Sequence, residues 1–288
     1  MPAGGLCSKK GGVQMKEKNR AIRKLWSRKT LQCLDFLTAK NLPPSRDSSH
    51  LHHGYTISIV ESGILPMNFR DFRLDLKPGD FLILGPEVPH SFNLSSQMGE
   101  CSYRTVFVKE EGLSGEAKRA VENEKATVSC FSDPALWESY LNIQRGVEAG
   151  SESDISDIIK SSELLLSKMA GNTISRMVVK SSHILAVKEY LKDNFASVPN
   201  IEELAEIAHI SPFYLMRLFK EEIGLSPHAY INQLRVNRAK EMMAEGLPLL
   251  QITYELGFTD QSHFSKTFLK ITGVNPNRYG NVCRWQMA

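Results

Sequence analysis

Hydrophobic and polar positions follow two different patterns along this chain of 288 residues, and the first is typical of short strands. From residue 55 to residue 108 the apolar residues occur in short runs, separated by turn residues such as those at 77–80 and 85–90. Alternation with a period of two and a β-branched composition predict strands, here over residues 55–60, 72–76, 81–84 and 101–108. Closely spaced strands of this kind indicate a small β-barrel or jelly roll.

Two helices are expected after these strands. Asp133 and Pro134 open a run of apolar residues at helical spacing, and residues 151–154 have the spacing of a helix-capping sequence. The second helix carries an apolar stripe at Ile155, Ile158, Ile159, Leu165, Leu166 and Met169. This stripe fits two roles, packing on the barrel or contact with a second copy of the chain, and the pattern leaves both open.

Beyond residue 180 the spacing is helical, and one segment occurs twice, 49 residues apart. The first copy begins at Ser211 and closes on Gly224, and the second begins at Asp260 and closes on Gly273. Serine and aspartate are good N-caps, and glycine tolerates the positive φ that ends many helices. Each copy therefore predicts a helix with matched ends.

A short amphipathic run precedes each copy, over residues 201–208 and 249–258, with the small residues Ala208 and Gly257 at equivalent positions. Two helices joined by a tight turn form a helix-turn-helix unit, whose second helix enters the major groove of DNA. Residues 226–245 predict a linking helix of roughly 30 Å, close to the ~34 Å between successive major-groove windows. We therefore expect two DNA readers held about one turn of DNA apart.

Residues 256–258 and 264–268, followed by Gly273, Pro276 and Tyr279, resemble the signature of the AraC/XylS family of bacterial transcription regulators. The resemblance covers about residues 181–284 and implies an all-α DNA-binding domain of seven helices with two helix-turn-helix units. It also implies that DNA is contacted by Phe213, Met216, Arg217, Lys220, Gln261, Ser262, Ser265 and Lys266. The sequence departs from the family pattern at Leu269, where a basic residue is common, so one phosphate contact is expected to be absent.

Some of these residues also fit other roles. Phe213 and Met216 suit a hydrophobic core as well as a reading face, whereas Arg217 and Lys266 lie off the apolar stripe of their helices. A helical-repeat scaffold would normally need three or more repeats, and this chain has two. The pattern therefore favours DNA reading.

The turn residues of the first half, Pro78, Gly79 and Asp80, then Gly85, Pro86 and His90, resemble a cupin motif. Many AraC-type regulators carry a sensor barrel of this kind, which implies a small-molecule effector and, through the helix of residues 155–169, an antiparallel contact across a homodimer. Polar residues expected near the barrel mouth, and so candidates to bind an effector, are His52, His53, Tyr55, Arg70, His90 and Arg104. Imidazoles suit transition metals, and His52, His53, His90 and Glu61 are possible ligands. The full cupin spacing is missing, so we expect no metal and no cofactor.

Charge and cysteine usage add limits. The formal net charge is +3, but residues 181–288 hold eleven basic and eleven acidic residues, so DNA affinity must come from local clustering of charge. Arg235 and Arg238 on the linking helix are expected to be structural. The five cysteines, at 7, 33, 101, 130 and 283, lack metal-site spacing and suit reduced thiols in a cytoplasm. No apolar run is long enough to span a membrane.

These observations predict an α+β cupin-like barrel with helices, followed by an all-α domain with two helix-turn-helix units. We expect a disordered tail over residues 1–20 (Met15 is an alternative start), a sensor and dimerisation domain over 21–170, a linker over 171–180 and the DNA-binding domain over 181–288. The expected function is sequence-specific transcription regulation without enzyme activity. The expected partners are double-stranded DNA, a second copy of the chain, a small effector and, for an activator, RNA polymerase. A constitutive regulator without a ligand and a metal-dependent cupin enzyme are the alternatives, and activation and repression are not distinguished.

Overall fold

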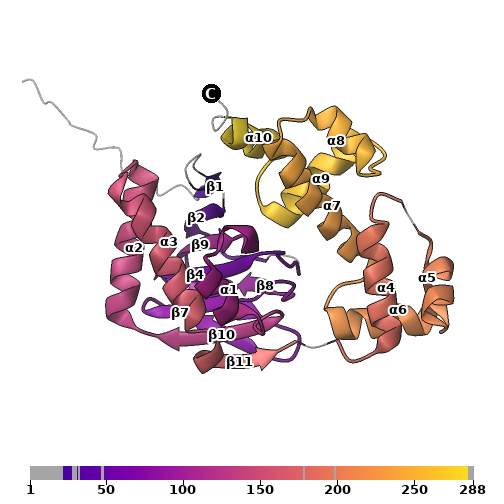
Figure 1. Ribbon diagram of the computed structural model, residues 1–288, viewed down its shortest axis with the longest axis horizontal. Coiled ribbons are helices and arrows are strands. Elements are labelled where there is room, and N and C mark those ends of the chain that lie inside the picture. Colours follow the sequence, from indigo (N-terminus) through magenta and orange to yellow (C-terminus); the bar gives the residue numbers. More distant parts are fainter. Residues whose placement is uncertain are drawn as a thin grey trace, which may run out of the picture.

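The computed structural model describes residues 22–27, 31, 33–46, 49–177, 179–197 and 199–284. Its first half contains strands covered by helices, its second half contains helices alone, and the two halves pack side by side (Figure 1). The expected tail over residues 1–20, with Met15, lies outside the described residues.

Seven strands of the first half form one sheet in the order β1-β2-β9-β4-β7-β10-β11. Their bounds are β1 Ile22–Ser27, β2 Leu34–Leu42, β4 Tyr55–Ser62, β7 Asp80–Leu84, β9 Cys101–Val108, β10 Thr127–Ser132 and β11 Thr173–Arg176. All the strand pairs in this sheet are antiparallel, with β4 between β7 and β9. The strands expected at 55–60, 81–84 and 101–108 are therefore confirmed.

A second sheet contains four strands in the order β3-β8-β5-β6. Its members are β3 Ser45–Arg46, β5 Leu65–Asn68, β6 Arg73–Leu76 and β8 Ser91–Leu94. The strand expected at 72–76 is thus confirmed as β6. Side chains of both sheets meet in one apolar cluster, with Leu82 and Leu84 from the larger sheet and Met67, Phe92 and Leu94 from the smaller. The expected small β-barrel or jelly roll is confirmed.

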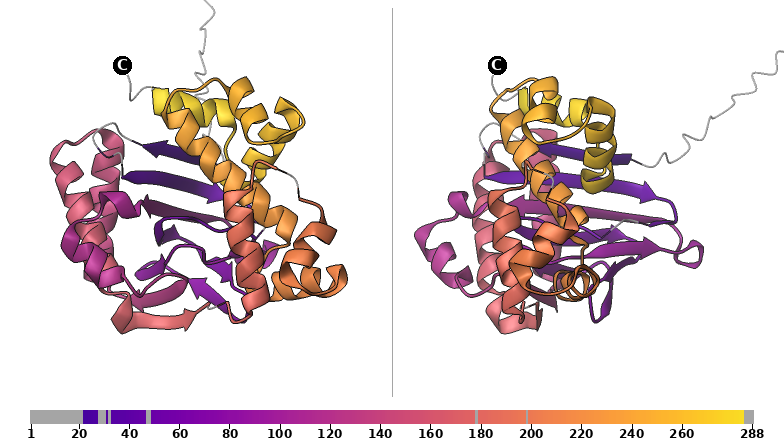
Figure 2. Two further views of the ribbon diagram at one scale, coloured as in Figure 1. Left: turned by 45° about the vertical axis from the view of Figure 1, so that its right-hand side comes forward. Right: turned by 90° about the vertical axis from the view of Figure 1, so that its right-hand side faces the viewer.

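Alternation on the long strands separates the two faces of the larger sheet. On β4, Tyr55, Ile57 and Ile59 point to the outer face, whereas Thr56 and Ser58 line the interior of the barrel. Helices α1 Gly115–Val121, α2 Pro134–Ala149 and α3 Ser153–Ser167 cover the outer face (Figure 2). Three short 3₁₀ helices complete this half, at Ser96–Met98, Glu110–Gly112 and Ala170–Asn172.

The apolar stripe of α3 and the residues after it packs on the barrel, so the first of its two possible roles is confirmed. Ile158, Leu165, Leu166 and Met169 are fully buried in the cluster between α3 and the sheet. A side chain with no exposed surface cannot contact a second copy, so the expectation that these four mediate dimerisation is wrong. Ile155 and Ile159 are half-buried, and Leu164, which was not expected at a contact, is 50% exposed.

Helix capping was predicted correctly for α2 but not for α3. The backbone N–H of Leu136 donates to the Asp133 side chain at 3.0 Å, as expected. Helix α3 instead has Glu152 as its N-cap, without a side-chain capping bond. The hydroxyl groups of Ser151 and Ser153 hydrogen-bond each other at 3.0 Å. They are therefore engaged with each other and do not cap the helix.

The second half contains seven helices within the described residues, as the family resemblance implies. They are α4 Ser182–Asp193, α5 Ile201–Ala208, α6 Pro212–Ile223, α7 Pro227–Ala244, α8 Leu249–Glu255, α9 Gln261–Thr272 and α10 Pro276–Arg284. Both ends of α9 lie 49 residues after those of α6, and α10 begins 49 residues after α7. The sequence repeat is therefore a structural repeat.

Matched caps set the ends of the repeated helices. Ser211 accepts from the N–H of Tyr214, and Asp260 accepts from the N–H groups of Ser262 and His263. Gly224 and Gly273 end the two helices with φ of 77° and 73°. These positive φ values favour glycine, because a Cβ would be strained there. The capping predictions for both copies are confirmed.

Helix α7 joins the two units to each other and to the barrel (Figure 2). Val236, Ala239 and Met242 of α7 belong to the same apolar cluster as the barrel interior. At the other end of the interface, Leu51 of the barrel is buried in the core formed by α4 to α7, and its N–H donates to Gln233 Oε1 at 3.4 Å. The two halves therefore share core residues.

The segment between the halves is shorter than the linker of ten residues expected at 171–180. Residues 173–176 of the expected linker form β11, which pairs with β10. Beyond it, the N–H groups of Lys180 and Ser181 both donate to the Glu222 carboxylate at 3.0 Å. Within the described residues, no helix has the length and apolar character needed to cross a membrane.

Candidate nucleic-acid interface and ligand cavity

The first unit pairs α5 with α6, and its candidate reading face is the exposed side of α6. Leu215 and Phe219 are buried in the core that also contains α4, α5 and α7, which orients α6. Phe213 is 82% exposed and Met216 is 41% exposed, so their alternative role as core residues is excluded. Arg217 and Lys220 are exposed on the same helix. The four residues expected on this face are all accessible to DNA.

Arg217 has a defined place on this surface. Its guanidinium carbon lies 5.3 Å from the centre of the Tyr214 ring, a cation–π contact on the helix surface. Such a contact limits the rotamers of Arg217 without using its N–H donors, which stay available for phosphate or guanine acceptors.

The second unit pairs α8 with α9 in the same way. Phe264 and Phe268 are fully buried, and their rings form a chain of edge contacts with Phe258 and Tyr279. The opposite side of α9 presents Gln261, Ser262 and Lys266, which are exposed, and Ser265, which is half-buried. Leu269, where the family pattern commonly has a basic residue, is 47% exposed on the same helix.

Helix α7 holds the two units together through one buried arginine. Arg235 donates to the carbonyl oxygens of Phe195 at 2.6 Å and Ser197 at 2.9 Å, and also to that of Ala196. A further bond of 3.1 Å reaches the carbonyl of Gly257 in the second unit. The structural role expected for Arg235 is confirmed. Arg238 is also structural and forms ion pairs on its own helical surface, with Glu241 at 2.7 Å and Glu245 at 3.4 Å.

A cavity of about 60 Å³ lies between the barrel interior and the helical half. Among its polar lining residues are His50, His52, His90, Thr56, Ser58 and Thr105 from the barrel. The helical half contributes Lys240 of α7 together with Ile271 and Thr272 in the last turn of α9. The cavity therefore touches the second recognition helix directly.

Two of the six residues expected to bind an effector line this cavity, namely His52 and His90. His53 is exposed and lies outside the lining. Arg70 is also outside it, because it donates to Asp71 and to the carbonyl of Glu222 at 3.1 Å. These two residues therefore do not belong to the cavity.

Tyr55 and Arg104 were expected at the barrel mouth but point to the helix-covered face of the sheet. The Tyr55 hydroxyl donates to the carbonyl of Val121 at 3.1 Å. Arg104, only 1% exposed, forms ion pairs with Glu61 and, at 2.8 Å, with Glu148 of α2. Because neighbouring strand residues face opposite ways, the positions next to Tyr55 and Arg104, Thr56 and Thr105, line the cavity in their place.

Glu61 is engaged on that outer face and is not a metal ligand. Burial alone would raise the pKa of its carboxyl group, but hydrogen bonds and charge from Arg104 and Arg145 hold this pKa below its ordinary value. The expectation of Glu61 as a possible fourth ligand is wrong.

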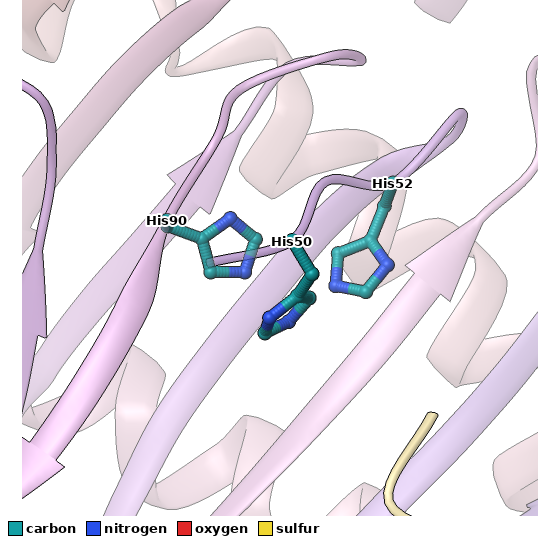
Figure 3. A group of neighbouring side chains, drawn as sticks. All are labelled: His50, His52 and His90. Atoms are coloured by element: carbon teal, nitrogen blue, oxygen red, sulfur yellow. The ribbon is translucent and has the colours of Figure 1, made fainter. Parts of the chain in front are cut away.

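Three imidazoles come together at the cavity, those of His50, His52 and His90 (Figure 3). Sequence reasoning named His53 in this group and missed His50. The signal was available, because His50 and His52 are separated by one residue and so fall on the same side of an extended segment. Thr56, Ser58 and Thr105 were missed as well, although their alternation with apolar residues is visible in the sequence.

Two family profiles match this chain. The one described as AraC-like ligand binding domain matches residues 39–167, and the one described as helix-turn-helix domain matches residues 204–281. Together they cover well over half of the chain. The fold and the matches define a DNA-binding transcription regulator with a ligand-binding domain, and the chain belongs to the AraC family.

Two sequence relatives agree with this assignment. YbfI of Bacillus subtilis strain 168, an HTH-type transcriptional regulator, is 24% identical over 223 residues, covering 75% of this chain and 80% of the relative. The arabinose operon regulatory protein of Escherichia coli K12 is 25% identical over 243 residues, covering 80% and 81%. A crystal structure of ToxT from Vibrio cholerae O395 is 13% identical, with a TM-score of 0.49, and covers 87% of this chain and 98% of that one. Both sequence relatives are named as regulators, which is consistent with a transcription regulator that is not an enzyme.

Proposed function

We propose that this protein binds one DNA site through two recognition helices, α6 and α9, which read neighbouring major-groove segments. The structural repeat supports this proposal, because the two helices have the same caps, the same buried stripe and exposed faces with polar and basic residues. The linking helix α7 has 18 residues and so spans about 27 Å, near the spacing of successive grooves.

Selection of genomic fragments bound by the purified protein at near-physiological salt tests this proposal. An enriched site with two conserved blocks about 10 base pairs apart is expected. A single block, or no enrichment with or without effector extracts, would contradict the two-helix model.

Single substitutions then assign contacts within the enriched site. Arg217→Ala and Lys266→Ala are each expected to weaken binding by about 1–3 kcal/mol where the contact is to a base. A phosphate contact would instead weaken binding to all sequences and lower the salt slope by about one. Lys160→Ala on α3 is the matched control, because it removes the same charge from an exposed position far from both units. Equal affinities for all the proteins would refute the role of both residues.

We further propose that a small effector bound in the cavity controls DNA binding. Support comes from the lining, since one cavity contacts the barrel, the linking helix and the last turn of α9. A ligand that prefers one arrangement of these elements shifts the population of chains able to bind DNA. Thr105→Leu, which fills the cavity with an apolar side chain, is expected to abolish the response to an effector. If the protein is instead a constitutive regulator without a ligand, its DNA affinity should be the same with and without added effector extracts.

Domain limits and assembly complete the proposal. The sensor domain of this proposal extends the expected residues 21–170 to include β11, which leaves a shorter linker before the DNA-binding domain at 181–288, in a cytoplasmic homodimer. Ile155 and Ile159 are the two residues of the expected dimer contact that keep accessible surface, and Leu164 adds an exposed apolar group on the same helix. Sedimentation equilibrium of wild type and Leu164→Lys tests this contact, since a dimer through α3 is expected to dissociate in the variant.

A further inference from the structure

The three cavity imidazoles converge from two chain segments. His50 and His52 precede β4, and His90 precedes β8. Their nearest ring nitrogens all lie within 4.8 Å of one another. The ring centres are 4.5 Å apart for His50 and His90, 5.1 Å for His50 and His52, and 5.2 Å for His52 and His90. Figure 3 shows the three rings grouped around a common point.

These spacings match those of three imidazoles on one metal ion. A zinc–nitrogen bond is about 2.0–2.1 Å, and a ring centre lies roughly 1 Å beyond its nitrogen, so two rings in a tetrahedral site have centres about 5 Å apart. The donor nitrogens of such a site are about 3.3 Å apart. Small rotations of the side chains close the present group to that distance, because the ring centres already lie where a metal requires them.

The backbone and one hydrogen bond orient the ligands. The N–H groups of His50 and His90 each donate to the carbonyl of the other residue, at 3.0 and 2.9 Å, which fixes the two segments together. The Nδ1 of His90 lies 2.9 Å from the carbonyl oxygen of Val88. Since a carbonyl only accepts, Nδ1 carries the proton and Nε2 presents its lone pair, the arrangement typical of a metal-binding histidine.

The surroundings leave one coordination position open toward the cavity. No carboxylate lines the cavity within the described residues, so the three histidines supply all the protein ligands. The buried hydroxyl of Thr56 has no hydrogen-bond partner. Lys240 lines the same cavity, where burial lowers the pKa of its amino group. In its charged form this group would be repelled by a bound metal ion unless an anion lay between them, so the open position suits an anionic ligand.

We propose that His50, His52 and His90 form a binding site for a divalent transition metal ion of the zinc, nickel or cobalt type. A fourth position on the ion is open to a water molecule or a small anion and faces Lys240 of the DNA-binding half. This site does not depend on DNA binding, so either proposal can fail without the other.

The first test titrates the metal-free full-length protein with Co²⁺. We expect one ion per chain and visible absorption of the intensity typical of tetrahedral cobalt, both reversed by a stronger chelator or by Zn²⁺. Absence of stoichiometric binding at micromolar metal would overturn the proposal.

Variants identify the ligands. His52→Gln and His90→Gln are each expected to weaken metal binding at least tenfold, whereas the adjacent His53→Gln, outside the cluster, is expected to bind like wild type. Equal losses in all three variants, or in none, would refute the assignment. If the cavity variants do not fold, X-ray absorption of the cobalt-loaded wild type still decides, since the proposal requires three imidazole ligands and fails with fewer than three.

Lys240→Met tests the open coordination position independently of metal binding by the three histidines. The variant is expected to bind Co²⁺ at least as tightly as wild type, because a nearby positive charge is removed. Its cobalt spectrum is expected to respond to added acetate or phosphate more weakly than that of wild type. An identical anion response in both proteins would show that Lys240 does not face the open position.

Discussion

Arg235 offers the strongest test of how the two helix-turn-helix units are held together. Its guanidinium donates to four backbone carbonyls, three in residues 195–197 and one at Gly257. Hydrogen bonds from charged donors contribute about 1.5–3 kcal/mol each, but burial of the guanidinium, which lowers its pKa, offsets part of that sum. Removing the guanidinium leaves buried carbonyl groups without a donor, at a cost of about 1–3 kcal/mol for each one that water does not reach. We therefore expect Arg235→Met to lower the free energy of unfolding of the helical half by about 3–5 kcal/mol.

The conservative variant Arg235→Lys separates charge from geometry. One ammonium group keeps the charge but cannot span carbonyls in two separate segments, so we expect a loss of about 2 kcal/mol. Urea unfolding followed by far-ultraviolet circular dichroism measures both changes, and Arg238→Met, whose partners are exposed, is the control. A loss below about 1 kcal/mol for Arg235→Met, or wild-type stability for Arg235→Lys, would refute the idea that this residue joins the units.

Three further substitutions test other parts of the structure. Gly257→Ala places a Cβ 2.0 Å from the carbonyl oxygen of Ala196 at a φ of +70°, so it is expected to destabilise the helical half by about 2–4 kcal/mol in urea, whereas Gly171→Ala, with nothing within 4 Å, is expected to be neutral. Phe219→Ala removes a fully buried ring and is expected to cost about 3–5 kcal/mol of stability, whereas the exposed Phe213→Ala is expected to leave stability unchanged and to weaken DNA binding. Burial alone would raise the pKa of the Glu87 carboxyl group, but Lys188 and Lys192 hold this pKa below its ordinary value. The two ion pairs therefore stabilise the folded protein at pH values above the ordinary pKa of glutamate. This stabilisation is lost as the pH falls through the lower pKa of the folded state. Glu87→Gln is accordingly expected to cost about 1 kcal/mol at neutral pH and nothing in acid, and a constant difference at all pH values would contradict this account.

The helical half could be predicted almost completely from the sequence because its signals are local. Caps at Ser211 and Asp260, glycines at the helix ends and apolar stripes within twelve residues all act between neighbours in the chain. The repeat supplied a second copy of each signal. The contact of α7 with the barrel could not be predicted from these patterns. It brings Lys240 to the same cavity as His50 and His52, which lie nearly two hundred residues earlier in the chain.

The barrel was predictable as a class but not in the direction of individual side chains. The strands were recognised from composition, whereas the inward positions depend on register, and a choice one residue off moved Tyr55 and Arg104 to the wrong face. The stripe on α3 shows a different limit. Packing on a sheet and packing on a partner bury the same kind of surface, so periodicity alone could not distinguish them.

Residues 50 to 52 join the cavity to the core of the first helix-turn-helix unit. His50 and His52 line the cavity, and Leu51 between them is buried in the core of α4 to α7. Three successive residues share two peptide planes, so a displacement of either histidine either carries Leu51 with it or twists the intervening backbone. We therefore expect a movement at the cavity to act directly on the core that orients the first helix-turn-helix unit. We expect Leu51→Ala to weaken the coupling between the cavity and this core, while every cavity-lining group stays in place.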